Sequence, residues 1–430
     1  MPHFGPQTKK AIENFPVSGW PVSSHVIHAI ALIKEHAALT NGELGSVDRY
    51  KAKKIAIAAS KIQKGKMSGE FPVDVFQTGS GTSTHMNVNE VIASLAGRDV
   101  HPNDDVNCGQ STNDVFPSAI AIACALRLRD GLIPVLRNFQ KELTKKSKQF
   151  NAITKTGRTH LQDAVPMKLG DEFTGYAALI DHALSQLTSA QKDLCVIPLG
   201  GTAVGTGLNA HPKLATKTIT RLKKATKLPL KKSNNRFAAQ SCPVTFLALS
   251  SALCETAVVL SKIANDIRMM GSTQYGELSL PELQPGSSIM PGKVNPVLCE
   301  SVMQVSQYCL GADTSVRLAL SNSSHFELNT SLPLLSQSLL VPINLLTNVT
   351  NAFSAKCVSK IKANKKTIEE HTAKNPILVT ALAPRIGYDK AAKIAKEAVK
   401  TGKPIVEVAA ARTKIDKATL KKLLDPSKMA

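Results

Sequence analysis

The sequence predicts a mainly α-helical protein whose central region of long helices is flanked by smaller domains. Three long stretches carry apolar residues at helical spacing, namely Val244–Met270, Val297–Asn322 and Leu332–Phe353. In the first of these the apolar residues cover more than one face, as expected for a helix buried in a bundle or at a subunit interface. Stretches with the alternating pattern of strands are few. We therefore expect a long-helix bundle at the centre of the fold.

Shorter helical patterns and one change in composition complete the predicted organisation. Helical spacing recurs in Val26–Leu39, Arg49–Ile62, Val115–Phe150 and Gly170–Leu187. Lysine becomes frequent after Cys357, which indicates the last domain boundary. The predicted domains are an N-terminal mixed helical domain with anion-binding loops (1–110), a central bundle domain that carries the loop 285–296 (111–356), and a small C-terminal helical domain (357–430).

The composition is that of a water-soluble globular protein. Of the 430 residues, 43% are hydrophobic and 20% are charged. No uninterrupted apolar run reaches the roughly 18 residues of a membrane span, and the first residues lack the pattern of a secretory signal. The eight cysteines are scattered, without a C-x-x-C pair or zinc-ligand spacing. We expect a cytoplasmic protein with reduced thiols and no metal site.

The net charge of +21 is the strongest compositional signal. Such a field attracts nucleic acid, anionic membranes or acidic metabolites. The lysines are spread over amphipathic stretches, and only 4% of the residues are aromatic, which leaves little surface for stacking bases. We expect neither a nucleic-acid nor a membrane partner, and interpret the charge as a general attraction for anionic metabolites combined with lineage-specific surface composition.

The loop Pro285–Pro296 combines glycines and prolines with polar side chains suited to a small anion. Its glycines and prolines break any regular period. Lys293 supplies a point charge, and Ser287, Ser288 and Asn295 supply hydrogen-bonding groups. An ordinary surface turn between two helices is the alternative.

Four further polar loops precede or join predicted helices. They are Phe76–Glu90, His101–Asp114, Gly157–Pro166 and Leu199–Asn209. The first two place hydroxyl and amide groups at helix starts, where they act as caps or hold an anion. In the third, His160 is either a structural residue or a general acid–base group. The fourth lacks the glycine spacing of a dinucleotide site.

Taken together and in order, these loops resemble class II fumarase, of the aspartase/fumarase superfamily. The motifs are Thr78-Gly-Ser-Gly-Thr82, His101-Pro-Asn-Asp104, Gln110-Ser-Thr-Asn-Asp114, Gly157-Arg-Thr-His-Leu-Gln-Asp163, Gly200-Gly-Thr-Ala-Val-Gly-Thr-Gly207 and Gly286-Ser-Ser-Ile-Met-Pro-Gly-Lys-Val-Asn-Pro296. Similar segments at both ends extend the resemblance over nearly the whole chain. The serine loop marks the superfamily, and Thr-Gly-Ser-Gly-Thr with Arg-Thr-His favours fumarase within it.

The resemblance implies a fold, an assembly and a reaction. The expected subunit is mainly α and has three domains, and its central helices form a twenty-helix core in a homotetramer. Each active site is then built from three subunits. The expected activity is that of a hydro-lyase of the tricarboxylic acid cycle, the reversible hydration of fumarate to (S)-malate, without a metal or an organic cofactor.

The resemblance also assigns roles to residues at matching positions. Ser287 is the expected base for the C3 proton of malate, and Lys293 with Asn295 holds the carboxylate. His160, paired with Glu300, handles the water. The remaining expected substrate-binding residues are Ser80, Thr82, Ser111, Thr112, Asn113 and Thr159. Arg98, His101, Asn103 and Asp104 match a secondary anion site.

These roles are consistent with elementary chemistry. A proton next to a carboxylate is very weakly acidic, so its removal requires fixed positive charge and donors directed at the developing enediolate. Serine is a poor base at its ordinary pKa and needs N–H groups and a cation to stabilise its oxyanion. Lys293 and helix N-termini are the expected sources of this stabilisation.

Four departures from the family pattern accompany the resemblance. His85 stands where asparagine is usual, directly after the hydroxyl loop. The segment 268–277 is about three residues shorter than usual, Ala238 replaces a usual glutamate, and Pro243 enters what is usually continuous helix. None of these departures removes an expected catalytic group.

Two other functions remain open at this point. Aspartate ammonia-lyase, or another lyase of the superfamily that releases fumarate, is the nearest alternative. Aspartase usually carries Gly-Ala-Gly-Thr and Arg-Thr-Gln in place of the motifs at Thr78–Thr82 and Arg158–His160. A non-catalytic structural or nucleic-acid-binding paralogue is the second alternative, motivated by the charge.

Overall fold

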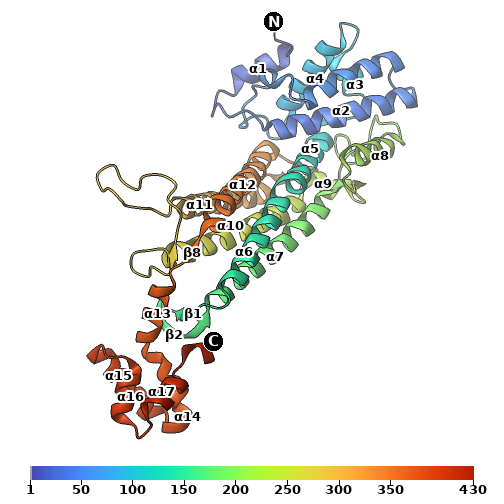
Figure 1. Ribbon diagram of the computed structural model, residues 1–430. Helices are drawn as coiled ribbons and strands as arrows, with labels where there is room; N and C mark the ends of the chain where they lie inside the picture. Colours follow the sequence, from blue (N-terminus) through green and yellow to red (C-terminus); the bar gives the residue numbers. More distant parts are fainter. Residues whose placement is uncertain (1) are drawn as a thin grey trace. The chain divides into compact units, whose positions relative to one another are not determined.

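The computed structural model describes residues 2–430 and confirms the mainly α-helical fold (Figure 1). The helices are α1 (Pro6–Asn14), α2 (Ser24–Leu44), α3 (Arg49–Gln63), α4 (Thr82–Ala96), α5 (Thr112–Arg127), α6 (Ile133–Phe150), α7 (Leu169–Leu194), α8 (Leu214–Thr226), α9 (Arg236–Ser241), α10 (Val244–Met270), α11 (Val297–Asn322), α12 (Leu332–Ala352), α13 (Lys365–Lys374), α14 (Ala383–Ile386), α15 (Tyr388–Thr401), α16 (Ile405–Arg412) and α17 (Lys417–Leu423). The long helices α10, α11 and α12 have the bounds that the apolar spacing predicts, to within one residue.

Strands in the described part of the chain form only four two-stranded sheets. The strands are β1 (Thr154–Thr159), β2 (Gln162–Lys168), β3 (Val196–Ile197), β4 (Lys231–Lys232), β5 (Leu278–Ser279), β6 (Ser324–His325), β7 (Leu328–Asn329) and β8 (Lys362–Ala363). The pairs β1–β2, β5–β8 and β6–β7 are antiparallel, and β3–β4 is parallel. The hairpin β1–β2 occupies a segment that the sequence predicts as a polar loop.

Two details correct or explain the expected helix boundaries. The predicted helix Val115–Phe150 is present as α5 and α6, joined by the π-helical turn Leu128–Leu132. Pro243 does not break a helix, because α9 ends before it and α10 begins directly after it. The carbonyl of Pro243 accepts a hydrogen bond from the Phe246 amide (2.9 Å). A proline at a helix start leaves no backbone donor unpaired, so this departure is compatible with a long α10.

The chain packs into two compact units, of which the first comprises the described residues up to 135, 183–258 and 304–348. Its N-terminal part is a packed pair, α2 and α3, with α4 and α5 against it. Asp48 caps α3 by accepting hydrogen bonds from the amides of Tyr50 (2.9 Å) and Lys51 (3.0 Å). Almost every side chain of α5 from Val115 to Ala125 is buried, so this helix is apolar all round.

The second unit comprises residues 136–182, 259–303 and 349–430. Aromatic pairs join its helices, with ring centroids 5.7 Å apart for Phe139 and Phe353 and 5.3 Å for Phe150 and Phe173. Contacts of this geometry stabilise a core beyond the area that they bury. The proposed domain boundaries at 110 and 356 remain a prediction from the sequence.

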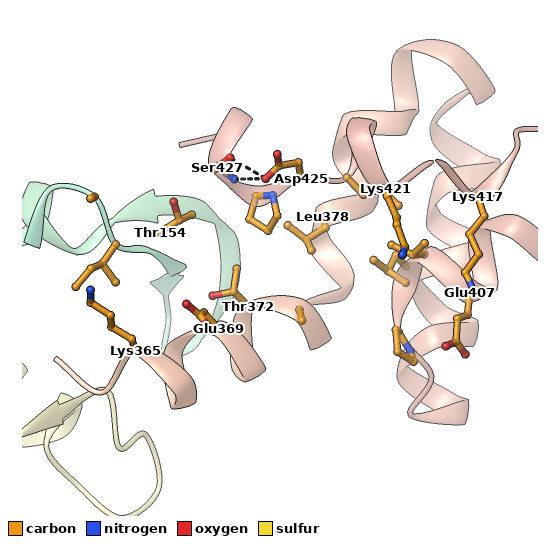
Figure 2. A pocket seen from close by; sticks show the side chains of 18 residues that line it. Thr154, Lys365, Glu369, Thr372, Leu378, Glu407, Lys417, Lys421, Asp425 and Ser427 are labelled. Atoms are coloured by element: carbon orange, nitrogen blue, oxygen red, sulfur yellow. Dashed lines mark hydrogen bonds between the residues drawn. The ribbon is translucent and has the colours of Figure 1, made fainter. Parts of the chain in front are cut away.

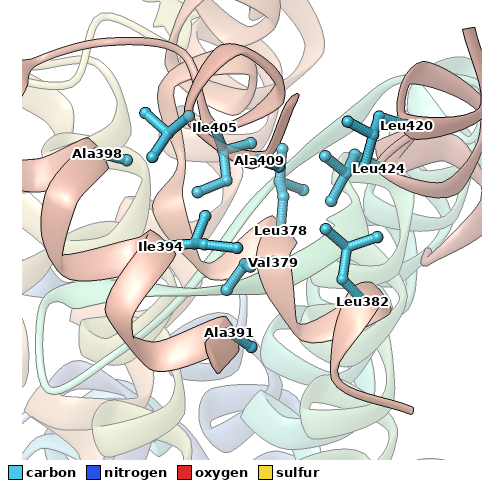
Figure 3. Close-up of a cluster of buried hydrophobic side chains, with 11 residues drawn as sticks. Leu378, Val379, Leu382, Ala391, Ile394, Ala398, Ile405, Ala409, Leu420 and Leu424 are labelled. Atoms are coloured by element: carbon cyan, nitrogen blue, oxygen red, sulfur yellow. The ribbon is translucent and has the colours of Figure 1, made fainter. Parts of the chain in front are cut away.

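The C-terminal helices have a hydrophobic cluster of their own (Figure 3). It is formed by Leu378, Val379, Leu382, Ala391, Ile394, Ala398, Ile405, Val408, Ala409, Leu420 and Leu424. These side chains come from the 3-10 segment Pro376–Leu382, from α15, α16 and α17, and from Leu424 directly after α17. The predicted helical character of the C-terminal segment is therefore confirmed, and its folding depends on this small core.

Two helical segments, Val244–Met270 and Leu332–Lys360, are long and apolar enough to cross a membrane by length and composition. The sequence predicts no membrane span, because no apolar run reaches roughly 18 residues. The most apolar windows of the two segments are 50% and 61% buried inside the structure. Core helices of soluble proteins pass the same test, so the finding is weak evidence for a membrane span.

All eight cysteines are free thiols, as the sequence predicts. Cys124, Cys195, Cys299, Cys309 and Cys357 are buried. The described residues also contain no group of three or more His, Cys, Asp or Glu side chains placed to hold a metal ion.

Replacement of Leu420 by alanine is expected to destabilise the C-terminal helices by roughly 2–5 kcal/mol, because it leaves a cavity in a small core. Leu420 is fully buried in this cluster. Urea unfolding combined with hydrogen exchange over residues 376–430 measures the effect. Val399→Ala, at a position that is 68% exposed on α15, is the control and is expected to change stability by less than about 0.5 kcal/mol. Equal unfolding midpoints for the two variants would contradict a C-terminal core centred on Leu420.

Candidate functional site

The serine loop Pro285–Pro296 lies between β5 and α11 and contains no helix or strand (Figure 1). The Ser287 hydroxyl oxygen accepts hydrogen bonds from two backbone amides, those of Ile289 (3.2 Å) and Met290 (3.1 Å). Two N–H dipoles directed at one oxygen stabilise negative charge on it. The loop thus supplies part of the stabilisation that a serine base requires.

The serine loop closes on itself through its two ends. The Gly286 amide donates to the carbonyl of Lys293 (2.9 Å), and the Asn295 side chain donates to the carbonyl of Gly286 (2.7 Å). A Cβ atom on residue 286 would lie 2.1 Å from the Lys293 carbonyl oxygen, so only glycine fits there. Ser287, Lys293 and Asn295 are therefore brought together, with the Lys293 side chain exposed.

Thr159 and His160 lie at the turn of the hairpin β1–β2, and both side chains are exposed. His160 and Leu161 have positive φ angles of 54° and 58°. This pattern of two central residues with positive φ is the geometry of tight hairpin turns that match the strand twist. Neither residue is glycine, so the turn holds His160 in a backbone conformation that costs free energy, as is common at functional sites.

A buried ionic cluster holds the base of this hairpin. The Lys155 ammonium lies 2.8 Å from carboxylate oxygens of both Glu172 and Glu277, and Arg158 donates to Glu277 (2.7 Å). Burial raises the pKa of Glu172, while Lys155 opposes this shift. The guanidinium of Arg158 also stacks on Tyr275, 4.6 Å from the ring centroid. These contacts fix β1 next to the segment after α10, and with it the position of His160.

A cavity of about 610 Å³ lies beside the hairpin. His160, Arg158 and Lys155 line it together with Tyr176 and Asp266. Tyr176 donates to Asp266 (2.9 Å), and burial raises the pKa of the Tyr176 hydroxyl. Of the four predicted catalytic residues, only His160 lines one of the five main cavities of the described residues.

In the first unit, Ser80 and Thr82 form a pair of hydroxyls at the start of α4. Their side-chain oxygens are 2.7 Å apart, and Ser80 is buried whereas Thr82 is exposed. Gly81 between them has φ +82°, and a Cβ atom there would lie 2.5 Å from the ring of Phe116 on α5. The glycine therefore allows the hydroxyl loop to pack directly on α5.

Ser111, Thr112 and Asn113 form the N-terminus of α5. Ser111 and Asp114 form a capping box, in which the Asn113 amide donates to the Ser111 hydroxyl (3.2 Å) and the Ser111 amide donates to Asp114 (3.0 Å). The Asn113 side chain donates to the carbonyl of Ala203 (2.8 Å). The Ser111–Asp114 capping box already caps the start of α5, so the Thr112 hydroxyl lies at the positive end of the helix without a capping role.

Asp114 connects this helix start to the glycine-rich loop Leu199–Asn209. The buried Asp114 carboxylate accepts a hydrogen bond from the Gly200 amide (2.7 Å). Burial raises its pKa, and the backbone amides of Ser111 and Gly200 oppose that shift. The loop therefore has a structural role at this position, which its glycine spacing alone did not indicate.

The four residues of the predicted secondary anion site lie on one exposed segment after α4. Arg98, His101, Asn103 and Asp104 are all exposed. The His101 ring nitrogen accepts from the Asp104 amide (3.2 Å) and caps the π-helical turn Pro102–Val106. Lys51 forms an ion pair with Asp105 in the same segment (3.0 Å).

The predicted catalytic and substrate-binding residues thus form four local groups. Ser287, Lys293 and Asn295 share the serine loop, and Thr159 and His160 share the hairpin turn. Glu300 lies on the first turn of α11 with an exposed side chain. Within the described residues, none of these three groups forms a hydrogen bond or ion pair with another in one chain. The fourth group lies in the first unit and comprises the polar residues at the starts of α4 and α5, two helices that are in contact.

The largest of these five cavities lies elsewhere, among the C-terminal helices, and has a volume of about 780 Å³ (Figure 2). Its walls combine apolar residues such as Leu378 with charged residues of both signs, including Glu407 on α16 and Lys421 on α17. No predicted site residue lines it.

Comparison with known proteins identifies the family. Residues 2–311 match the family described as Lyase, and residues 378–430 match the family described as Fumarase C C-terminus. The chain is 44% identical to a protein named fumarate hydratase class II from Xylella fastidiosa, over 99% of this chain and 91% of the relative. It is also 44% identical to fumarate hydratase class II 2 from Pseudomonas aeruginosa, over 99% of this chain and 94% of the relative.

A solved structure agrees with the sequence comparison. The class II fumarase of Schistosoma mansoni superposes with a TM-score of 0.96 at 36% identity, covering 100% of this chain and 96% of that chain. With both family segments, the near-full-length relatives and this structural match, the chain belongs to the class II fumarate hydratase family of lyases.

Proposed function

We propose that this protein catalyses the reversible hydration of fumarate to (S)-malate, with Ser287 as the base in the malate-to-fumarate direction. The observation that carries the proposal is the pair of amide hydrogen bonds to the Ser287 oxygen, at 3.2 and 3.1 Å. A serine that removes a carbon-bound proton must carry negative charge, and these donors lower the free energy of that charge. Membership of the family supports the same reaction.

In this proposal Lys293 and Asn295 hold the carboxylate next to the C3 carbon. As Ser287 takes the proton, the electron pair of the C–H bond moves toward that carboxylate, which becomes a dianionic enediolate. A fixed ammonium group stabilises the dianion more than the starting carboxylate, so it accelerates the step. The closure of the loop by Gly286 keeps Lys293 next to Ser287 in the chain fold.

His160 and Glu300 complete the chemistry by handling the hydroxyl group that leaves C2 as water. An imidazole protonates a leaving hydroxyl group, and in the reverse direction it accepts a proton from the attacking water. The strained turn and the buried ionic cluster below it hold His160 in place. A carboxylate such as Glu300 stabilises the imidazolium form.

The second carboxylate of the substrate is assigned to hydroxyl and amide donors at two helix starts and to one hydroxyl in the hairpin. The helix-start donors are Ser80 and Thr82 at α4 and Ser111, Thr112 and Asn113 at α5, and the hairpin hydroxyl is that of Thr159. Neutral donors at positive helix ends bind an anion without adding a side-chain charge.

We further propose a homotetramer whose active sites each combine three subunits. The catalytic groups of one chain lie in separate local clusters, which is compatible with sites completed by other copies. Long helices of the first unit also leave large apolar side chains exposed: Val244 (61%), Val258 (52%), Tyr308 (51%) and Leu318 (55%). Apolar positions on long helices of this kind are suited to helix packing between subunits.

The remaining assignments follow from the same family membership. We propose a cytoplasmic enzyme of the tricarboxylic acid cycle that needs no cofactor, and a secondary anion site at Arg98, His101, Asn103 and Asp104. Fumarate and malate are small dianions, so the charge of +21 favours their encounter with the protein.

Fumarate formation distinguishes this function from the aspartate alternative. Purified protein incubated with (S)-malate is expected to release fumarate, which is followed by ultraviolet absorbance. The same protein incubated with aspartate is expected to release none. Fumarate release from aspartate alone would contradict the proposal and assign the chain to the ammonia-lyase reaction.

Replacement of Ser287 by alanine is expected to lower kcat by roughly 10²–10⁴-fold, because it removes the base while leaving the loop hydrogen bonds of Gly286 and Asn295. Steady-state kinetics with malate measure the loss. Ser288→Ala, at the exposed neighbouring position, is the matched control and is expected to retain most activity. Near-normal turnover by Ser287→Ala would remove Ser287 from the base role.

Replacement of His160 by asparagine is expected to lower kcat by about 10²-fold and to remove one limb of the pH–rate profile, since asparagine does not titrate. Asparagine also tolerates positive φ, so the hairpin turn is expected to remain folded. Rates measured across a pH series, with circular dichroism as a folding control, test this. A pH profile of unchanged shape would show that His160 is not the titrating group.

A further inference from the structure

His85 is fully buried on α4 and contacts the start of α5. Its exposed fraction is 1%, and its Nδ1 atom lies 2.7 Å from the Thr112 hydroxyl oxygen. The second ring nitrogen, Nε2, is buried and has no hydrogen-bond partner within the described residues. Only one of the two ring nitrogens therefore has a hydrogen-bond partner, and this difference favours one tautomer of the neutral ring over the other.

The surroundings of His85 favour the neutral imidazole. Burial lowers its pKa well below the usual value, and the nearby Lys34 lowers it further. Lys34 is itself fully buried on α2 and donates to Asn107 (2.7 Å), and burial lowers its pKa to about 7, opposed by Asp114. The imidazole therefore carries one proton, on Nδ1 or on Nε2.

The two possible tautomers have different consequences for Thr112. A proton on Nε2 would leave a buried N–H donor without a partner, which is rarer in proteins than an unpaired acceptor. It would also require the Thr112 hydroxyl to donate to Nδ1. A proton on Nδ1 satisfies the donor through Thr112 and leaves only a bare lone pair at Nε2. In that case the hydroxyl proton of Thr112 remains free.

We propose that His85 is a positioning residue for the dicarboxylate site: Nδ1–H donates to the Thr112 hydroxyl oxygen, so that the hydroxyl proton of Thr112 is directed to the bound carboxylate. This inference rests on the proposed function, which places Thr112 among the substrate ligands. Thr112 occupies the first position of α5, where the helix end already attracts an anion. Asparagine, the usual residue of the family at this position, also has a side-chain N–H group that is able to donate this hydrogen bond.

A double-mutant cycle tests the coupling through malate kinetics. His85→Leu and Thr112→Val are each expected to raise KM about 10- to 100-fold, the loss of one hydrogen bond to a charged group, with a smaller change in kcat. The double variant His85→Leu/Thr112→Val is expected to match Thr112→Val alone, because His85 acts through Thr112. His85→Asn, which keeps a donor, is expected to restore KM to within about threefold of the original protein. His28→Leu, at a half-buried position on α2, is the matched control and is expected to leave KM unchanged.

The tautomer is measured independently of activity by ¹⁵N NMR of histidine-labelled protein, with His85→Asn identifying the signal. A neutral ring protonated on Nδ1 is expected. A ring protonated on Nε2, multiplicative KM effects in the double variant, or an unchanged KM in Thr112→Val would each overturn the inference. These outcomes are distinct from failure of the proposed function, which is shown by original protein that forms no fumarate from malate.

Discussion

A serine acts as a base only where the negative charge on its oxygen is stabilised, and this constraint organises the proposed site. The amides of Ile289 and Met290 lie 3.2 and 3.1 Å from the Ser287 oxygen because the loop turns sharply after Ser287. The loop conformation also depends on Gly286, because only a residue without a side chain allows its amide to donate to the carbonyl of Lys293 at the other end of the loop.

The same principle, fixed dipoles in place of mobile charges, applies to the substrate-binding groups of the first unit. Ser80 and Thr82 lie at the start of α4, and Ser111, Thr112 and Asn113 lie at the start of α5, so their hydroxyl and amide groups lie at positive helix ends. Buried residues hold these helix starts in place, as the hydrogen bond between His85 and Thr112 and the one from Gly200 to Asp114 illustrate. Groups that are already oriented need no reorganisation when the charge of the transition state develops.

Sequence reasoning succeeds in this protein where a pattern has a period or a spacing. The apolar spacing of α10, α11 and α12 gives their bounds to within one residue, and the order of the loops identifies the family. Sequence reasoning fails for the hairpin β1–β2, because β1 is polar, neither strand has an alternating pattern, and their pairing depends on a turn at His160. The buried Lys155 cluster is not predicted either, because the residues that flank a lysine in the sequence do not show whether its ammonium group is buried or exposed. The donors to Ser287 belong to the backbone, which has no sequence signature.

Replacing single backbone amides by esters tests most directly whether these donors activate Ser287. Incorporation of the α-hydroxy acid analogues of isoleucine at 289 and of methionine at 290 exchanges each N–H for an oxygen while keeping the side chain. The measurement is kcat for malate dehydration by each ester variant, compared with the side-chain variants Ile289→Ala and Met290→Ala. Each ester variant is expected to lose roughly 10²-fold in kcat, similar to removal of one oxyanion donor, and the alanine variants are expected to change little. Ester variants with undiminished turnover would contradict this activation of Ser287.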